Sequence, residues 1–542
     1  MKLVRLSIEG HYKGLSDLTF DFSAATGQIA ALVGLNGSGK SQLLELLVEV
    51  FALIERSQRS DFKRRQPFPF KAVLEFEEAP VLPEPIHRYR VALGLDGEIL
   101  CDQLTSDEWS TIHFQDLPLP DHIVGYSSGL NENLQRAFLK NKLQYFDVMS
   151  VRANRRSRRA TTDREDHPDI ETHYRQRYPG IFPEVDPYGM LVERDTKLPI
   201  GVYLDYDCCA LVIAALSIIP DVEMNSLVQE LPFKHIKKFS LRYDLRNAPI
   251  EEDSVKDIQL LIEISGREPI QHCPKSSDVQ FERIELDYLS ATIEFDFSDP
   301  ATRARMAEAH YNSPLALFKK LYRLQLLGVN KLPARDKRKL RNDRFFGNVK
   351  MPLKLPSTIE VFDIWLDDGV GAIDFDDLSD GETQLIQVLG AARIFRDSRA
   401  LIIFDEPDTH LNPHWRTHFH QYLSAALIAP EGESRTQVLI SAHSSFMISS
   451  LRKENVFLFT KEQNRTQMRG ALEQTFGSSF DILTKRFFGL YSLISQTAVE
   501  EIKDTLNTKD RPTARLWIEE NIGDSMEKAY LLRKLQDDAT SP

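Results

Sequence analysis

The amino-acid sequence predicts an α/β protein in which an antiparallel β-subdomain and a large mixed α/β insertion accompany a parallel sheet. Residues 29–34 form an apolar run that enters a glycine-rich loop and then an apolar helix. Residues 400–404 form a second apolar run, which ends in two acids. Strands buried on both faces of a parallel sheet are continuous apolar runs of this kind.

Length and composition describe an ordinary globular protein with more than one lobe. The 542 residues exceed what one hydrophobic core usually spans. The net charge of −13 argues against a whole-surface grip on nucleic acid, so any such contact needs a local basic patch. The four cysteines suggest no disulfide framework, and no apolar run is long enough to cross a bilayer. We therefore expect a cytoplasmic protein that makes no contact with a membrane.

Four consecutive segments are expected along the chain. Residues 1–130 hold the glycine-rich loop and the β-subdomain, where an Asp-Gly pair suits a hairpin turn. Residues 131–355 form the mixed α/β insertion, residues 356–465 return to strand–helix alternation, and residues 466–542 form a charged helical extension. Sustained heptads are absent from the insertion, so a long coiled-coil arm is not expected.

The glycine-rich loop matches the P-loop pattern GxxxxGK[ST] and lies between a strand and a helix, where that pattern has meaning. Its glycines let backbone N–H groups surround phosphates, and the helix N-terminus adds its positive end. Lys40 is expected to reach the β- and γ-phosphates of ATP, and the Ser41 hydroxyl to ligate Mg²⁺. The expected ATP-binding loop residues are Asn36, Gly37, Ser38, Gly39, Lys40 and Ser41.

The two acids after the second apolar run have the form of a Walker B motif. A buried parallel strand delivers Asp405 to a metal at its carboxyl end. Glu406, next in the chain, can hold the attacking water as general base. His443 follows another apolar strand, at the place of a switch histidine that senses the γ-phosphate. Glu406, His443 and Lys40 are the expected catalytic residues.

The stretch LSDGETQ, residues 378–384, resembles the signature of ABC-type ATPases. Ser379 can also be described as the cap of a helix with Glu382 at its third position, which is the same local structure. In that family the helix N-terminus faces the ATP of the other protomer. The resemblance implies that Ser379 and Gly381, with Asp408 of the D-loop, complete an ATP site across a head-to-tail homodimer.

The order of the motifs decides the predicted fold class. The P-loop, signature, Walker B and histidine occur in the order typical of an ABC-type P-loop ATPase head. The stretch between Lys40 and Asp405 is far longer than a transporter cassette needs. We therefore expect a soluble ABC-type head with an antiparallel β-subdomain and a large mixed α/β insertion, binding ATP and Mg²⁺.

Longer phrases point to particular relatives. The opening strands, the P-loop, LSDGE, DEPDTHLNPHW and ISAHS together resemble the RecF-like and AAA_21 ATPases. The phrases HIVGYSSGLNEN, VYLDYD and EQTFG with FDILTKRFFGL are similar to restriction-system-associated and Septu-type anti-phage defence ATPases. The resemblance implies an ATP-gated dimer or higher oligomer that acts as sensor and regulator of a co-encoded effector, a nuclease or another toxin.

The sequence departs from the family pattern at two places. An obvious Q-loop glutamine is missing, and the candidates are Gln115 and the stretch Tyr126–Ser128. Tyr12 and Lys13 stand where relatives often have Phe-Arg near the nucleotide base.

Two alternative functions stay open. One is a DNA-repair ATPase of the RecF kind, which ATP-stimulated binding to DNA ends or gaps would identify. The other is an OLD-like nuclease that uses Asp205 and Asp207 as a metal-binding DxD pair. We prefer to interpret these as solvent-facing turn acids, because a Toprim nuclease domain should follow the head rather than interrupt it.

The densest basic cluster suggests nucleic acid as a further partner. Phosphate contact by all five arginines would give a salt slope near roughly −4.5 on duplex DNA, at about −0.9 for each contact. The alternative, a solvated loop, is preferred because three acids follow at residues 163–166. The cluster consists of Arg152, Arg155, Arg156, Arg158 and Arg159.

Overall fold

The computed structural model describes most of the chain. Two compact units divide it, Met1–Phe476 and Gly477–Pro542. The described residues are 1–58, 70–78, 86–105, 107–129, 134–143, 145–146, 199–220, 233–246, 252–274, 286–342, 357–429, 435–463, 465–490 and 494–537, with isolated positions between 221 and 251.

An antiparallel sheet of order β2-β1-β4-β5-β6-β7 forms the predicted β-subdomain. The expected hairpin joins β5 to β6, and Gly97 in its turn has φ of 99°, a value that glycine adopts without strain. The strands are β1 (Lys2–Tyr12), β2 (Leu15–Asp21), β4 (Phe70–Glu78), β5 (His87–Leu93), β6 (Ile99–Thr105) and β7 (Glu108–Ile112).

The second sheet has the order β18-β17-β3-β16-β15-β8-β9 and holds the P-loop strand near its middle. All neighbouring strands are parallel except β17 and β18, which form an antiparallel pair. The central strands are buried along their whole length, which explains their continuous apolar runs. The strands are β3 (Ile29–Gly34), β8 (His122–Ser127), β9 (Gly201–Leu204), β15 (Ala400–Asp405), β16 (Gln437–Ala442), β17 (Val456–Glu462) and β18 (Arg465–Gly470).

The third sheet is antiparallel, with the order β11-β12-β10-β13-β14. Residues 359–367, expected to take part in the strand–helix alternation of the C-terminal lobe, instead pair with β10. Buried and more exposed residues alternate along this strand, as in a sheet with one face on the core. The strands are β10 (His235–Asp244), β11 (Ile270–Pro274), β12 (Tyr288–Asp296), β13 (Ile359–Asp367) and β14 (Ala372–Asp374).

The α/β fold class with its antiparallel subdomain and mixed α/β region is thus confirmed. The sheets extend across the boundaries predicted at 131 and 355: β9 belongs to the parallel sheet, and β13 to the sheet of the insertion. The division into four segments stays a prediction.

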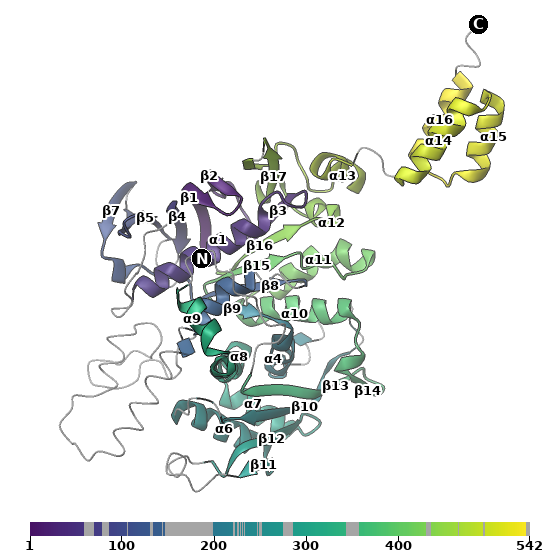
Figure 1. Ribbon diagram of the computed structural model, residues 1–542. Helices are drawn as coiled ribbons and strands as arrows, with labels where there is room; N and C mark the ends of the chain where they lie inside the picture. The colour runs from purple at the N-terminus through teal and green to yellow at the C-terminus, as the bar shows by residue number, and fades with distance from the viewer. Residues whose placement is uncertain are drawn as a thin grey trace. The chain divides into compact units, whose positions relative to one another are not determined.

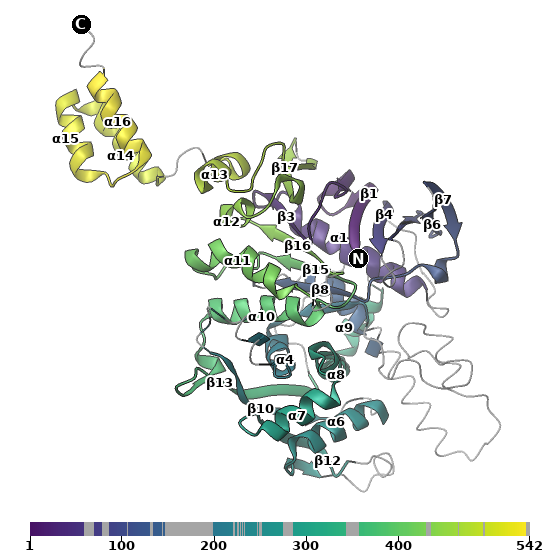
Figure 2. The same cartoon turned by 180° about the vertical axis from the view of Figure 1, so that it is seen from behind.

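Helices α10, α4 and α8 lie between the parallel sheet and the five-stranded sheet in both views (Figures 1 and 2). The helices of this unit are α1 (Lys40–Ser57), α4 (Tyr206–Leu216), α6 (Glu252–Ser265), α7 (Pro300–Ala309), α8 (Pro314–Leu326), α9 (Ala334–Asn342), α10 (Asp380–Phe395), α11 (Pro413–Ala426) and α12 (Ser445–Ser449). The 3₁₀ turns are η1 (Phe114–Asp116), η2 (Leu327–Lys331), η3 (Phe375–Asp377) and η4 (Lys453–Asn455).

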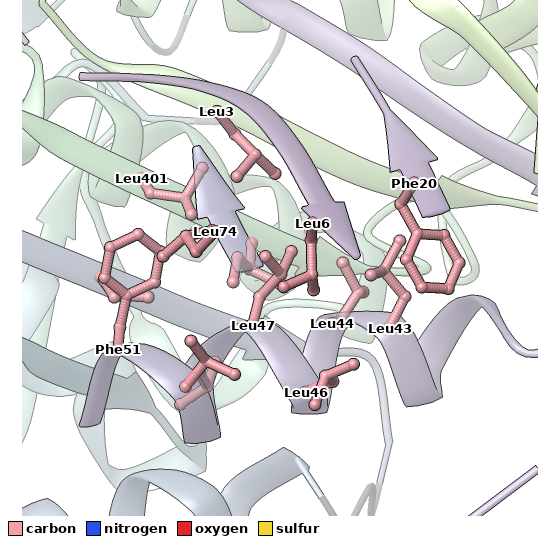
Figure 3. Close-up of a cluster of buried hydrophobic side chains, with 14 of the residues drawn as sticks. Leu3, Leu6, Phe20, Leu43, Leu44, Leu46, Leu47, Phe51, Leu74 and Leu401 are labelled. Carbon is pink, nitrogen blue, oxygen red and sulfur yellow. The ribbon is translucent and has the colours of Figure 1, made fainter. Parts of the chain in front are cut away.

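Helix α1 lies between the antiparallel sheet and the parallel sheet, and is buried on almost every side. Figure 3 shows Leu43, Leu44, Leu47 and Phe51 directed toward side chains of β1, β4 and β15. A helix enclosed in this way must be apolar all round, so its buried acids need partners. Lys140 meets Glu49 at 2.8 Å, and Lys13 pairs with Glu45.

The second unit is helical. Its helices are α13 (Phe480–Phe488), α14 (Gln496–Thr508), α15 (Arg511–Asn521) and α16 (Met526–Asp537). The predicted helical extension from residue 466 therefore begins with a strand, β18, because Arg465–Gly470 complete a hairpin with β17. Among the described residues, no helix combines the length and the apolar character that a membrane span requires.

His122, the first residue of β8, predicts a pH-dependent stability. Its ring is buried against Phe395, and neither ring nitrogen has a hydrogen-bond partner among the described residues. Burial lowers the pKa of His122 far below its usual value, Lys319 adds to this effect, and Asp121 opposes it. In the unfolded chain the imidazole of His122 therefore binds a proton near pH 6.5, whereas in the folded chain it stays unprotonated at that pH. The free energy of unfolding falls as the pH drops below that value.

Between pH 7 and pH 5, this single group should remove about 2 kcal/mol from the free energy of unfolding. His122→Phe should abolish that part of the loss, as urea denaturation at several pH values would measure. The exposed His11, changed to Phe, is the control and should leave the pH dependence unaltered. Equal pH slopes for wild type and His122→Phe would contradict the prediction.

Candidate active site

The carboxyl ends of four parallel strands bring the predicted motifs to one edge of the sheet. Asp405 at the end of β15 is in register with Ser441 of β16 and with Ser127 of β8. Ser441 is in turn in register with Leu32 of β3, two residues before the P-loop. Ligand sites of α/β proteins lie at this edge, beyond the carboxyl ends of the strands.

The P-loop has the backbone that phosphate binding needs. Gly34, Gly37 and Gly39 all have positive φ, at 147°, 76° and 107°. A side chain at Gly34 would overlap the carbonyl of Phe459 on β17, whereas Gly37 has open space around it. Helix α1 starts at Lys40 without a side-chain cap and without an acid in its first turn. Its free N–H groups and positive dipole end suit an anion.

Two P-loop side chains have polar atoms that could hydrogen-bond to a nucleotide. The Ser38 hydroxyl is buried and makes no hydrogen bond among the described residues. Lys40 Nζ folds back on its own loop, donating to the carbonyl oxygens of Gly34 at 2.8 Å and Leu35 at 3.1 Å. Burial lowers the pKa of Lys40 to about 8, although Glu406 and Asp405 oppose the shift. Asn36 is exposed at the tip of the loop.

One carboxylate oxygen of Asp405 accepts hydrogen bonds from two hydroxyl groups. Ser41 Oγ donates to Asp405 Oδ1 at 3.2 Å, and Ser441 Oγ donates to the same atom. The residue that the P-loop motif assigns to the metal thus lies beside the Walker B acid, although the two are 364 positions apart in sequence. Their oxygens form a hard donor set of the kind that Mg²⁺ prefers.

Glu406 and His443 meet next to this pair. His443 Nε2 lies 2.8 Å from Glu406 Oε1. Burial, and then the neighbouring Asp405, raise the pKa of Glu406, while Lys40 opposes the shift. Burial and Lys40 lower the pKa of His443. Glu406 also has φ of 55°, a left-handed conformation that is uncommon for residues other than glycine.

The D-loop closes the same edge. Asp408 is buried, and burial raises the pKa of its carboxyl although Arg416 opposes the shift. Arg416 donates to the backbone carbonyls of Asp408 and Thr409. Ser128, from one of the two Q-loop candidates, donates its N–H to Asp405 O at 3.0 Å and meets the Thr409 hydroxyl at 2.9 Å. The other candidate, Gln115, is exposed in η1, before the amino end of β8.

The signature residues lie at the start of α10 and not at the P-loop of the same chain. Ser379 caps the helix and forms the expected capping box with Glu382. Gly381 packs so closely on the D-loop that a Cβ atom there would lie 2.8 Å from the His410 carbonyl oxygen. No hydrogen bond joins Ser379 or Gly381 to the P-loop within the described part of the chain. The intrachain site is therefore assembled without the signature.

The residues present fit a magnesium nucleotide. The uncapped helix, the unsatisfied Ser38 hydroxyl and the folded Lys40 suit phosphate oxygens, and Ser41 with Asp405 suits the metal. The electrostatics agree, since Lys40 is the buried cation between the loop carbonyls and the two Walker B acids.

Two further predictions concern residues outside these motifs. Asp205 is not the solvent-facing turn acid expected: it caps α4 by accepting from Cys208 N at 3.1 Å, and its carboxylate lies 3.6 Å from the buried Lys142. Within the described residues, no group of three or more His, Cys, Asp or Glu side chains could hold a metal ion. The arginine cluster at 152–159 lies outside the described residues.

Sequence reasoning missed two residues of the site. Ser441 contacts both Walker B acids, but a serine two positions before the histidine carries no signal by itself. Gln384 is buried in α10, where it donates to Tyr126 OH at 3.2 Å and accepts from His410 N at 3.0 Å. Two glutamines spaced three residues apart in the apolar run of α10, Gln384 and Gln387, were the available sign of this bridge between α10, β8 and the D-loop.

Comparisons with known proteins agree with the motifs. Residues 240–449 match the family model AAA_21, "AAA domain, putative AbiEii toxin, Type IV TA system". The match begins within β10 and covers the signature, Walker B and His443, but not the P-loop. A 127-residue segment is 26% identical to Protein ea59 of Escherichia phage lambda; it represents 22% of this chain and 22% of that protein.

Two solved structures are also similar. The SMC head domain from Thermotoga maritima has 11% identity and a TM-score of 0.32, with 87% of this chain and 99% of that chain covered. The SmcHead bound to the C-winged helix domain of ScpA has 12% identity, a TM-score of 0.31 and the same coverage. Over residues 240–449, the chain is thus similar to AAA_21 ATPases, and its α/β head brings a P-loop and a Walker B motif together.

Proposed function

We propose that this protein binds and hydrolyses ATP with Mg²⁺. The observation that carries the proposal is the meeting of Ser41, Asp405, Glu406 and His443 at the edge where the P-loop begins α1. Backbone N–H groups of the loop and Lys40 bind the phosphates. Bound Mg²⁺ neutralises phosphate charge and polarises the bond that breaks.

Glu406 is the proposed general base. Burial and the neighbouring Asp405 raise its pKa, which makes it a more basic carboxylate than an ordinary exposed one. His443 contacts the same carboxylate and lies at the end of the neighbouring strand. Burial and Lys40 lower its pKa, which favours the neutral ring, and a neutral ring can donate a hydrogen bond without carrying a charge.

A head-to-tail homodimer follows as the proposed active form. The start of α10 presents Ser379 and Gly381 at the positive end of the helix dipole, where the acids Asp380 and Glu382 also lie and Glu382 holds Ser379 through the capping box. Since these groups make no hydrogen bond to the P-loop of their own chain, a second copy would bring them to it. The D-loop packs directly on this helix start, through Gly381 and His410. Dimer closure and the Walker B edge would thus move together.

The proposed biological role is to regulate a separate effector in anti-phage defence, as the resemblance to defence ATPases implies. The helical unit Gly477–Pro542 supports a docking role, because it exposes large apolar side chains that a protein partner could cover. They are Phe480, Ile482, Leu490, Leu516, Met526 and Tyr530.

One experiment tests both levels of the proposal. The purified chain, alone and with each co-encoded protein, is incubated with DNA and RNA under ATP, Mg²⁺ and Mn²⁺, while phosphate release is followed. We expect ATP hydrolysis by the chain alone and nucleic-acid cleavage or toxicity only with a partner. Absence of ATP hydrolysis in every mixture contradicts the ATPase. Cleavage by the chain alone that disappears in Asp205→Ala favours the OLD-like alternative, and ATP-stimulated DNA-end binding without an effector favours the repair alternative.

A further inference from the structure

Ser441 contacts both Walker B acids, Asp405 and Glu406. It lies one position before the end of β16, and its side chain is fully buried. Its hydroxyl donates to Asp405 Oδ1 and accepts the backbone N–H of Glu406 at 3.2 Å. Its carbonyl oxygen accepts the same N–H at 3.1 Å. One serine therefore contacts the side chain of one acid and the backbone of the other.

The backbone contact matters because of the geometry of Glu406. Successive side chains of an extended strand point to opposite faces, so Asp405 and Glu406 could not both serve one site if β15 continued straight. At Glu406 the chain turns into the left-handed region, with φ of 55°, which is strained for a residue with a side chain. Its N–H is held there by two acceptor atoms of Ser441.

The side-chain contact matters because the two hydroxyl donors to Asp405 differ in their roles. The P-loop motif assigns Ser41 to the metal, so its hydroxyl would have to serve the metal as well as Asp405. Ser441 has no such second role, and its hydroxyl is placed to orient the Asp405 carboxylate. Ligating carboxylates are oriented by hydrogen bonds of this kind.

We propose that Ser441 is a positioning residue that fixes the orientation of Asp405 toward Mg²⁺ and the turn that aims Glu406 at the attacking water. The inference rests on the proposed ATPase function and deepens it. Ser441 touches neither nucleotide nor metal in this scheme. It acts through Asp405 and Glu406. Its loss should therefore reduce the magnesium-dependent part of the ATP affinity and the turnover of ATP, but not the binding of phosphate by the P-loop.

The test compares three variants in the full-length protein. Ser441→Ala removes the hydroxyl, Ser441→Thr restores it, and Ser398→Ala is the matched control. Ser398 is a buried serine that precedes β15, at the opposite edge of the sheet, and its hydroxyl bonds only to the Phe395 carbonyl among the contacts described. Calorimetry measures the affinity for ATP in EDTA and for ATP in Mg²⁺, and phosphate release measures kcat and KM.

For Ser441→Ala we expect ATP affinity in EDTA within about twofold of wild type. The gain in affinity that Mg²⁺ provides should fall by about tenfold, the usual contribution of a hydrogen bond to a charged group. kcat should fall by about tenfold to a hundredfold, with a smaller change in KM. Ser441→Thr should recover most of both losses, and Ser398→Ala should show neither.

Each other outcome is decisive. Wild-type kcat and a wild-type Mg²⁺ gain in Ser441→Ala overturn the inference alone, since the ATPase itself would be intact. An equal loss in Ser398→Ala also overturns it, because the effect would then be one of general strand packing. If Ser441→Ala does not fold, Ser441→Cys, of nearly the same volume but with a weak donor, replaces it under the same expectations. A wild-type chain that neither binds nor hydrolyses ATP overturns the proposed function and this inference with it.

Discussion

Glu406→Gln should bind ATP with nearly wild-type affinity and hydrolyse it about 10²–10⁴-fold more slowly, because a positioned general base contributes that much to turnover. The amide has the same shape but cannot accept the proton. Lys40 and the uncapped start of α1, which we propose hold the phosphates, are unchanged in this variant. Single-turnover phosphate release would measure the loss, and light scattering would follow the accumulation of an ATP-bound dimer.

The matched control for this variant is Asp397→Asn. Asp397 is an exposed acid before the amino end of β15, at the edge of the sheet away from the site. Asp397→Asn removes the same charge as Glu406→Gln, so a nonspecific effect of net charge would appear in both variants. Wild-type turnover in Glu406→Gln would show that another group is the base.

Gly34→Ala should lose nucleotide binding and about 2–5 kcal/mol of stability. A Cβ atom at Gly34 would overlap the Phe459 carbonyl of the neighbouring strand, and φ of 147° is strained for any residue with a side chain. β3 or β17 would have to shift, and the P-loop would shift with it. Urea denaturation and calorimetric titration with ATP would measure the two effects.

Gly37→Ala separates strain from steric overlap. Gly37 also has a positive φ, of 76°, but a Cβ atom at this position would meet no other atom within 4 Å, so only the backbone strain of about 1–2 kcal/mol is expected. Equal stability losses in the two variants would contradict the assigned overlap with Phe459.

The sequence was most informative where chemistry restricts it. The P-loop, the acids at 405–406 and His443 each follow an apolar strand, and parallel strands place their carboxyl ends together. Their assembly could therefore be predicted without coordinates. The capping box at Ser379 was equally readable, because it is a local interaction between residues three apart.

Long-range pairing could not be read in the same way. β13 has the alternation of a half-buried strand, but nothing in it specifies β10, more than a hundred residues earlier, as its partner. The left-handed turn at Glu406 and the contacts of Ser441 depend on the register between β15 and β16. The buried bridge from Gln384 to Tyr126 and His410 likewise joins three segments that are separate in sequence.

The contact between β18 and the P-loop has a mechanical consequence. Thr466 donates its hydroxyl to Ser38 O at 3.0 Å, and its side chain lies against Gly39. The loop therefore cannot adjust its backbone around a phosphate independently of the β17–β18 hairpin. That hairpin is the last sheet element before Gly477, where the helical unit starts. The backbone of the proposed nucleotide-binding loop is thus tied to the segment of chain that leads into the helical unit.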